Sequence, residues 1–176
     1  MGTKKQEARK KAAAAPAPSA FEQAVAAAGL TSEPGKGAVE GCYRGLIDGK
    51  MATTRFTGSV DMDAAFESAE GRANRWDFGL GVRATGQPEC AVWVEPHSAA
   101  STGEVKTMLA KLDWLQAKLA QPSFKPLKAL TDACVAQGRR PYHWLASANV
   151  AIRPGSREAN MLAARGMDLP KSRVVI

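Results

Sequence analysis

Two acidic residues and a histidine stand near the ends of neighbouring apolar segments and could together bind a metal ion. Asp77 lies in Arg-Trp-Asp-Phe, and Glu95 and His97 lie in Trp-Val-Glu-Pro-His, with Glu95 eighteen residues after Asp77. Two convergent carboxylates suit a hard divalent cation such as Mg²⁺, with water and a substrate phosphate completing its coordination. Such an ion polarises a phosphate ester and supplies hydroxide near neutral pH, so these residue types indicate phosphoester hydrolysis.

Three alternating segments predict the strands that would position these side chains. They cover residues 55–63, 75–82 and 90–97. Asp77 falls near the start of the second segment and Glu95 near the end of the third, so the carboxylates meet if these segments form an antiparallel hairpin. Glu95 and His97 project to the same side as Trp93, because side chains alternate along a strand.

Helices are expected on both sides of these strands. The capping-box sequence Ser101-Thr102-Gly103-Glu104 precedes an apolar stripe from Val105 to Leu119, which predicts a long helix. Further helices are expected over residues 21–28, 38–47, 127–137 and 157–165, and a buried fourth strand over residues 142–152. The sequence therefore predicts an α/β fold with a mixed sheet of about four strands flanked by helices, in the order α-β-β-β-α-β-α.

This element order and these acids resemble the PD-(D/E)XK phosphodiesterase superfamily over roughly residues 38–152. The resemblance implies a restriction-endonuclease-like core, in which an acid on the second strand and an (Asp/Glu)-x-Lys on the third bind metal and activate water. In this chain Asp77 would be the first metal ligand, Glu95 the second, and Glu40 a further ligand from the first helix. His97 stands where the family has lysine.

Two kinds of residue can replace that lysine. His97 can act as a general base, because the unperturbed pKa of histidine is about 6.5, and it can also bind a metal. Alternatively, as in family members whose lysine has migrated, Lys106 or Lys111 of the following helix can reach the site. Lys111 is favoured because it borders the apolar stripe and can extend its ammonium toward the strand ends. The expected catalytic set is Asp77, Glu95, His97 and Lys111.

Asp61 and Asp63 form a rival pair of metal ligands. On a strand they would share one face about 7 Å apart, which also suits a divalent cation. Alternatively, these two acids bind no metal and simply form a polar, solvated face of the strand. For Asp77 the alternative is an exposed carboxylate paired with Arg75 or Arg83.

The sequence thus predicts a nuclease that uses Mg²⁺ or Mn²⁺ to hydrolyse phosphodiester bonds, with DNA rather than RNA as the expected nucleic acid. The alternative is a non-catalytic module of the same fold that binds protein or nucleic acid, which the absence of the family's lysine favours. A homodimer or a protein partner stays open in both cases. The chain has no G-x-x-x-x-G-K-[ST] loop and no nucleophile-elbow sequence, which excludes two other enzyme classes.

The positive charge of the chain is concentrated at its start. Residues 1–12 contain five Lys/Arg and one Glu, which gives +4 of the net charge of +7. Residues 1–19 are expected to be a disordered basic tail rich in Ala and Pro, serving either solubility or salt-sensitive attraction to polyanions. Residues 20–176 are expected to form a single α/β domain.

Composition and cysteine usage predict a soluble cytoplasmic protein. Hydrophobic residues make up 45% of the chain and charged residues 23%, as is typical of globular domains. No apolar stretch of about 18 residues that could cross a membrane is present, and no cleaved leader is expected. The three cysteines, Cys42, Cys90 and Cys134, stand singly, which argues against a disulfide framework and against a structural zinc site.

Overall fold

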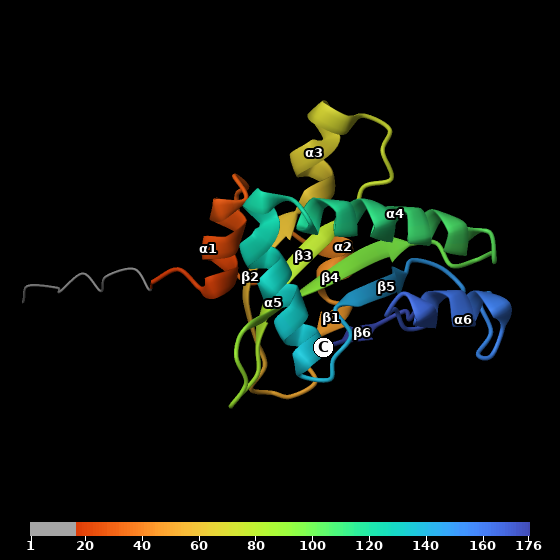
Figure 1. Cartoon of the computed structure of the whole chain (residues 1–176). Helices are drawn as coiled ribbons and strands as arrows, with labels where there is room; N and C mark the ends of the chain where they lie inside the picture. Colours follow the sequence, from red (N-terminus) through yellow and green to blue (C-terminus); the bar gives the residue numbers. More distant parts are fainter. Residues whose placement is uncertain (1–16) are drawn as a thin grey trace, which may run out of the picture.

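A computed structural model of the chain describes residues 17–176 and contains a four-stranded mixed sheet (Figure 1). The strands are β2 (Arg55–Asp61), β3 (Phe78–Arg83), β4 (Cys90–His97) and β5 (Tyr142–Ala146), hydrogen-bonded in the order β2-β3-β4-β5. The first three form an antiparallel meander, and β5 runs parallel to β4. The predicted α/β class, with a mixed four-stranded sheet flanked by helices, is confirmed.

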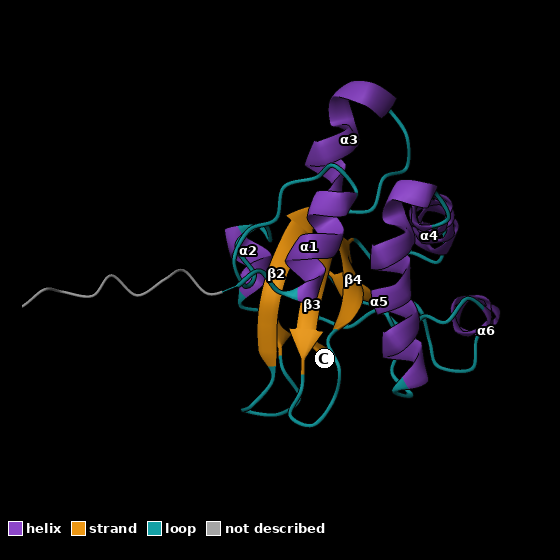
Figure 2. Ribbon diagram, turned by 60° about the vertical axis from the view of Figure 1, so that its left-hand side comes forward, coloured by secondary structure: helices purple, strands orange, loops and turns teal. Residues whose placement is uncertain are grey.

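Helices and a small second sheet cover the two faces of the main sheet. One face packs against α1 (Ala20–Ala27), α4 (Glu104–Leu119), the 3-10 helix η1 (Pro122–Phe124), α5 (Lys125–Ala136) and α6 (Arg157–Ala164). The other face packs against α2 (Gly41–Arg44) and the parallel pair β1 (Ile47–Asp48) and β6 (Val174–Val175). Between β2 and β3, α3 (Met62–Glu70) projects away from the sheet (Figure 2).

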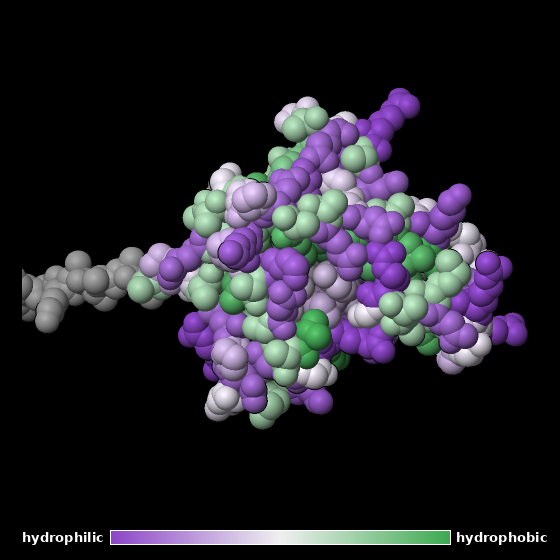
Figure 3. Space-filling view, in the orientation of Figure 1, coloured by the Kyte–Doolittle hydropathy of each residue, from purple (hydrophilic) through white to green (hydrophobic). Residues whose placement is uncertain are grey.

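Alternation along the strands divides the core into two clusters. Trp93 packs under the helices, whereas Val92 and Val94 of the same strand pack on the opposite face. The helix-covered side of β3 bears glycines: a Cβ on Gly79 would lie 2.6 Å from the Trp93 ring, and one on Gly81 would lie 2.5 Å from Phe21. These glycines therefore make room for large aromatic side chains. On the face shown in Figure 3, hydrophilic side chains are interspersed with apolar ones.

The helix expected over residues 38–47 is wrong except for one turn, Gly41–Arg44. The main chain that follows is used in sheet pairing, because Ile47 pairs with Val174 in β1 and β6. Lys36 holds the turn by donating from Nζ to the carbonyl oxygens of Arg44, at 2.8 Å, and Ile47, at 2.7 Å. Tertiary contacts thus replace the helix that the apolar spacing indicated.

The strand expected over residues 55–63 ends at Asp61, where an unexpected helix begins. Asp61 is the N-cap of α3, and its carboxylate accepts a hydrogen bond from the Ala64 N–H at 2.8 Å. Capping satisfies one of the free N–H groups of the first helical turn. Asp61 and Asp63 therefore do not lie together on a strand face.

Other element boundaries shift by a few residues. The strand expected from residue 75 begins at Phe78, and Trp76 joins the core under the helices rather than the face of Phe78. The strand expected over residues 142–152 ends at Ala146. The long helix is confirmed, but its N-cap is Gly103 and no side chain caps it. Ser156, by contrast, caps α6 as expected.

Two further sequence expectations concern membrane-spanning helices and the basic tail. No helix in the described part of the chain is both long and apolar enough to span a membrane. Most of the predicted basic tail, residues 1–16, lies outside the described residues.

Candidate active site

Asp77 and Glu95 face each other across the start of β3 and the end of β4. Phe78 pairs with Val94 in the antiparallel register, which places the preceding Asp77 opposite Glu95. The Asp77 N–H donates to Glu95 Oε2 at 2.9 Å, and the Asp77 carbonyl oxygen accepts from the Met62 N–H at 2.7 Å. The hairpin expected from the sequence therefore brings the two acids together.

Lys111 reaches these carboxylates from α4, which lies across the sheet. Its Nζ is 2.5 Å from Glu95 Oε1 and 3.3 Å from Asp77 Oδ1. The apolar stripe of α4 packs on the helix-covered face of the sheet, and Lys111 borders Leu112 and Met108 of that stripe. Three residues predicted from the sequence, Asp77, Glu95 and Lys111, therefore form one cluster, which we call the carboxylate–lysine site.

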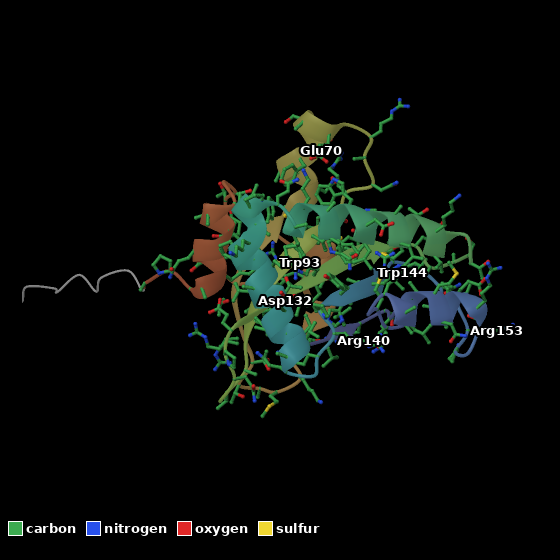
Figure 4. All side chains as sticks on the ribbon, in the orientation of Figure 1. Glu70, Trp93, Asp132, Arg140, Trp144 and Arg153 are labelled. Atoms are coloured by element: carbon green, nitrogen blue, oxygen red, sulfur yellow. The ribbon has the colours of Figure 1, made fainter. Side chains whose placement is uncertain are left out.

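The carboxylate–lysine site is largely removed from water. The Glu95 side chain has no exposed surface, that of Lys111 is 15% exposed and that of Asp77 is 24% exposed. Trp93 and Trp144, both labelled in Figure 4, are buried beside Glu95: one lies two residues before it in β4, and the other pairs with it in β5. Asp77 is thus the member of the site most open to an incoming substrate.

Burial shifts the titration of both acids toward the neutral form. Desolvation raises the pKa of Glu95 well above its usual range, the charge of Asp77 raises it further, and Lys111 opposes the shift. Desolvation also raises the pKa of Asp77 despite its contact with Lys111. Burial lowers the pKa of Lys111, but attraction to Glu95 and Asp77 outweighs burial and raises it overall. Lys111 therefore remains a cation between two acids that compete for its single positive charge.

His97 is directed to a different partner. Its Nε2 lies 2.9 Å from Glu104 Oε2 at the start of α4, and its ring lies against Trp144 at a centroid distance of 6.5 Å. Glu104 and Lys111 are seven residues apart, two helical turns, so His97 and the carboxylate–lysine site meet the same side of α4 at different levels. The structure does not bring His97 into hydrogen-bond contact with Asp77 or Glu95 in the described chain.

Glu40 lies outside the pair of carboxylates. It is exposed and immediately precedes α2, and it makes no side-chain capping bond there. Among residues 17–176, no group of three or more histidine, cysteine and acidic side chains is arranged to hold a metal ion. Glu40 therefore does not complete a three-carboxylate site with Asp77 and Glu95.

The rival acids and the second helical lysine also stay apart from the site. Asp61 caps α3, and Asp63 Oδ1 accepts from Arg75 Nε at 2.8 Å. Lys106 is exposed and has no salt bridge within the described chain. Asp77 is bound by Lys111 rather than by Arg75 or Arg83, so the arginine pairing considered for it is wrong.

Tyr43 is a neighbour of the site that the sequence did not single out as functional. Desolvation raises the pKa of its hydroxyl, and so do the negative charges of Cys42, Glu40, Asp77 and Glu95. Tyr43 is half-buried on α2, beside the core face that includes Phe78. In the sequence, Tyr43 is recognisable only as an apolar position at helical spacing. Such spacing gives no information about a site on another element.

Asp77 and Glu95 fit a hard divalent cation in the type of their donor atoms. Magnesium binds through one or two carboxylates and takes its other ligands from water and substrate phosphate. Lys111 Nζ now lies between the two acids, so a divalent ion binding to both would compete with the ammonium for Glu95 Oε1. The two acids therefore match Mg²⁺ or Mn²⁺ in donor type, and such an ion would share them with Lys111.

No family model, curated protein or solved structure matches this chain. What the site does is therefore argued from its residues.

Proposed function

We propose that this protein is a divalent-metal-dependent nuclease that hydrolyses phosphodiester bonds, with DNA as the favoured substrate. The observation that carries the proposal is the contact of Lys111 Nζ with both Glu95 and Asp77. Two acids from adjacent strands and one lysine from the next helix meet at one point, although they are far apart in the sequence. The resemblance to PD-(D/E)XK phosphodiesterases supports the same chemistry.

Phosphodiester hydrolysis needs an activated water, a stabilised phosphorane and a protonated leaving group. Water attacks phosphorus and forms a new P–O bond, the bond from phosphorus to the leaving oxygen breaks, and one proton passes from the water to that oxygen. Negative charge accumulates on the non-bridging oxygens during this step. A site for this reaction therefore needs positive charge directed at the phosphate.

Lys111 supplies that charge from the protein. Because its acidic neighbours keep it protonated, it acts as a hydrogen-bond donor and fixed cation rather than as a general base. Asp77, the more exposed acid, accepts a proton from water or orients it, and the fully buried Glu95 holds Lys111 and the Asp77 main chain in place. A bound Mg²⁺ or Mn²⁺ would be held by Asp77 and Glu95 and would supply Lewis-acid polarisation of the phosphate.

The proposal is tested by cleavage assays on plasmid DNA, single-stranded DNA and RNA with Mg²⁺, Mn²⁺ or EDTA. Asp77→Asn, Glu95→Gln and Lys111→Met should each lower cleavage by at least about 100-fold, as loss of an activating or charge-stabilising group does. His97→Gln should have a much smaller effect, because its ring is bound to Glu104 and not to the site.

Asp132→Asn is the matched control. Asp132 is an exposed acid on α5 that pairs with Lys128 on the same helix, so its loss should leave cleavage unchanged. If Asp77→Asn cleaves as fast as the unmodified protein, the activity is not that of this site and the proposal fails. If His97→Gln lowers cleavage as much as Lys111→Met does, His97 rather than Lys111 has the role proposed for the lysine.

One observation favours the alternative of a non-catalytic binding module. Lys111 already neutralises part of the charge of Asp77 and Glu95, so the three residues can serve as a closed ion-pair network without a metal. In that case calorimetry with Mn²⁺ should detect no binding, and all three nucleic acids should remain uncut. Binding of Mn²⁺ that Asp77→Asn abolishes would exclude this alternative.

A further inference from the structure

A second polar pocket lies on the opposite face of the sheet, near the start of β5. It has a volume of about 320 Å³, and the polar side chains that border it are Lys50, Arg139, Arg140, His143 and Asp168. An adjoining pocket of about 270 Å³ shares Lys50 and Arg139. We call the two together the basic pocket; their combined volume falls within the range for small-molecule sites.

The cations of the basic pocket come from segments far apart in the sequence. Lys50 follows β1, and Arg139 lies between α5 and β5. Within the described residues neither forms a salt bridge with a side-chain carboxylate, and Arg139 Nη1 contacts Cys90 Sγ at 3.4 Å and Gln137 Oε1 at 3.3 Å. The hydrogen bond from Cys134 and the charge of Arg139 lower the pKa of Cys90 to about 7, so this thiol offsets part of the Arg139 charge. Two cations that border one pocket without a carboxylate side chain paired to either favour an anionic ligand.

The remaining charges at the basic pocket are already paired. Asp168 forms ion pairs with Arg140, whose Nε lies 3.2 Å from Oδ1, and with Lys171, whose Nζ lies 3.5 Å from Oδ2. Its carboxylate is thus shared by two other cations and does not neutralise Lys50 or Arg139. The Lys50 main-chain N–H donates to the main-chain oxygen of Ile176 at 2.6 Å, which fixes Lys50 at the rim.

The His143 ring supplies an unused polar atom in the same place. Its Nε2 is buried and has no hydrogen-bond partner in the described chain. Buried polar atoms are nearly always paired, and an exception in a pocket indicates a missing partner. One hydrogen bond between Nε2 and a phosphate oxygen would give both atoms a partner, with the proton on either of them.

We infer that the basic pocket binds the phosphate group of a small phosphorylated compound. Lys50 and Arg139 would neutralise the phosphate, and His143 would complete its hydrogen bonds from below. Phosphate is favoured over a carboxylate because it offers enough oxygens to contact a guanidinium, an ammonium and an imidazole together. This site is separate from Asp77 and Glu95 because the two lie on opposite faces of the sheet. His143 pairs with Val94, next to Glu95, but Val94 faces away from the helices, whereas Glu95 faces Lys111 of α4. Arg140, labelled in Figure 4, precedes β5.

The two histidines of the chain make the test direct. They are His97 and His143, so spectra of the ¹⁵N-labelled imidazoles contain signals from two rings in the described chain. The full-length protein is titrated with inorganic phosphate, ribose 5-phosphate or AMP at constant ionic strength. The His143 Nε2 signal should move with saturation at a Kd below about 1 mM for at least one probe, while the His97 signals stay in place. The strongest of the three probes identifies whether phosphate alone, a sugar or a nucleotide is preferred.

Lys50→Gln should weaken binding of that probe about 5- to 10-fold, since it removes one charge-assisted contact. Lys125→Gln is the matched control, because Lys125 is an exposed lysine at the start of α5 and does not border the basic pocket. Asp77→Asn should leave the titration unchanged, which separates this inference from the proposed nuclease. A His143 signal that no probe moves, or equal weakening in Lys50→Gln and Lys125→Gln, would overturn the inference.

Discussion

His143 is held neutral by its position at the start of β5. Burial lowers the pKa of its ring from 6.5 to about 4, and the charges of Lys171 and Arg139 add to the shift, while Asp168 and the Arg140 backbone oppose it. The folded protein therefore binds fewer protons at His143 than the unfolded chain below pH 6.5. The stability that neutral His143 contributes to the folded state is complete above 6.5, the pKa of the ring in the unfolded chain. It is lost as the pH falls from 6.5 toward 4, the pKa of the ring in the folded protein.

This shift predicts an acid-sensitive component of stability. The free energy of unfolding should fall by up to about 3 kcal/mol across this interval on account of His143 alone. Urea denaturation at a series of pH values should show that His143→Gln, which does not titrate, has a flatter profile than the unmodified protein by about this amount. A constant difference between the two proteins across the interval would show that His143 is not the cause.

The sequence could predict which residues meet at the candidate site, but not the contacts that keep other candidates away from it. Asp77, Glu95 and Lys111 are predictable because acids at the ends of paired strands and a lysine beside an apolar stripe converge by simple strand and helix periodicity. Asp61 is an equally good acid by type, and only the helix that begins there removes it. His97 has the right spacing on its strand, but its partner Glu104 lies on another element, so periodicity could not show that contact.

Gly79 of β3 makes room for side chains of the two neighbouring strands. A Cβ on Gly79 would lie 2.6 Å from Trp93 Cζ3 and 3.0 Å from Val60 Cγ1. Trp93 cannot easily move away, because its Nε1 donates to Thr131 Oγ1 on α5 at 3.0 Å. Gly79→Ala should therefore lower the free energy of unfolding by about 2–3 kcal/mol, as overpacking of a core does.

Gly45→Ala is the control for this substitution. Gly45 has a φ of −75°, which any residue can adopt, and no atom that would crowd a new Cβ lies within 4 Å. Its unfolding free energy should stay within about 0.5 kcal/mol of the unmodified protein or rise slightly, since alanine restricts the unfolded chain. Chemical denaturation of both variants measures the difference, and equal losses would mean that the contact with Trp93 is not limiting.

Elements with strong local patterns were predictable, and elements defined by tertiary contacts were not. The strand Cys90–His97 and the long helix ending at Leu119 follow from alternation and from an apolar stripe. The two-residue strands β1 and β6 have no local signal, because each exists only by pairing with a segment more than a hundred residues away. The same pairing explains why the apolar spacing of residues 38–47 did not yield a full helix.

At the scale of the whole molecule, positive charge and candidate chemistry are located in different parts of the chain. Residues 1–12 carry a net +4, whereas the other 164 residues carry +3 of the total of +7. Within the described chain several acids are paired with cations, including Asp63 with Arg75 and Glu70 with Lys118. Long-range attraction to a polyanion should therefore depend on the first residues more than on the folded part.

Deleting residues 2–16 should then weaken DNA binding without changing the chemical step. Removing one phosphate contact reduces the slope of log affinity against log salt by about 0.9, so removing the five Lys/Arg of this segment should reduce it by up to about 4.5. Fluorescence anisotropy with labelled duplex, in an Asp77→Asn background that prevents cleavage, measures this slope. A full-length variant with the five Lys/Arg of this segment changed to Gln should reproduce the effect, because charge rather than length is responsible. An unchanged slope in both variants would show that the folded residues alone bind the nucleic acid. In proteins that keep Asp77, single-turnover cleavage at low salt should be the same with and without residues 2–16.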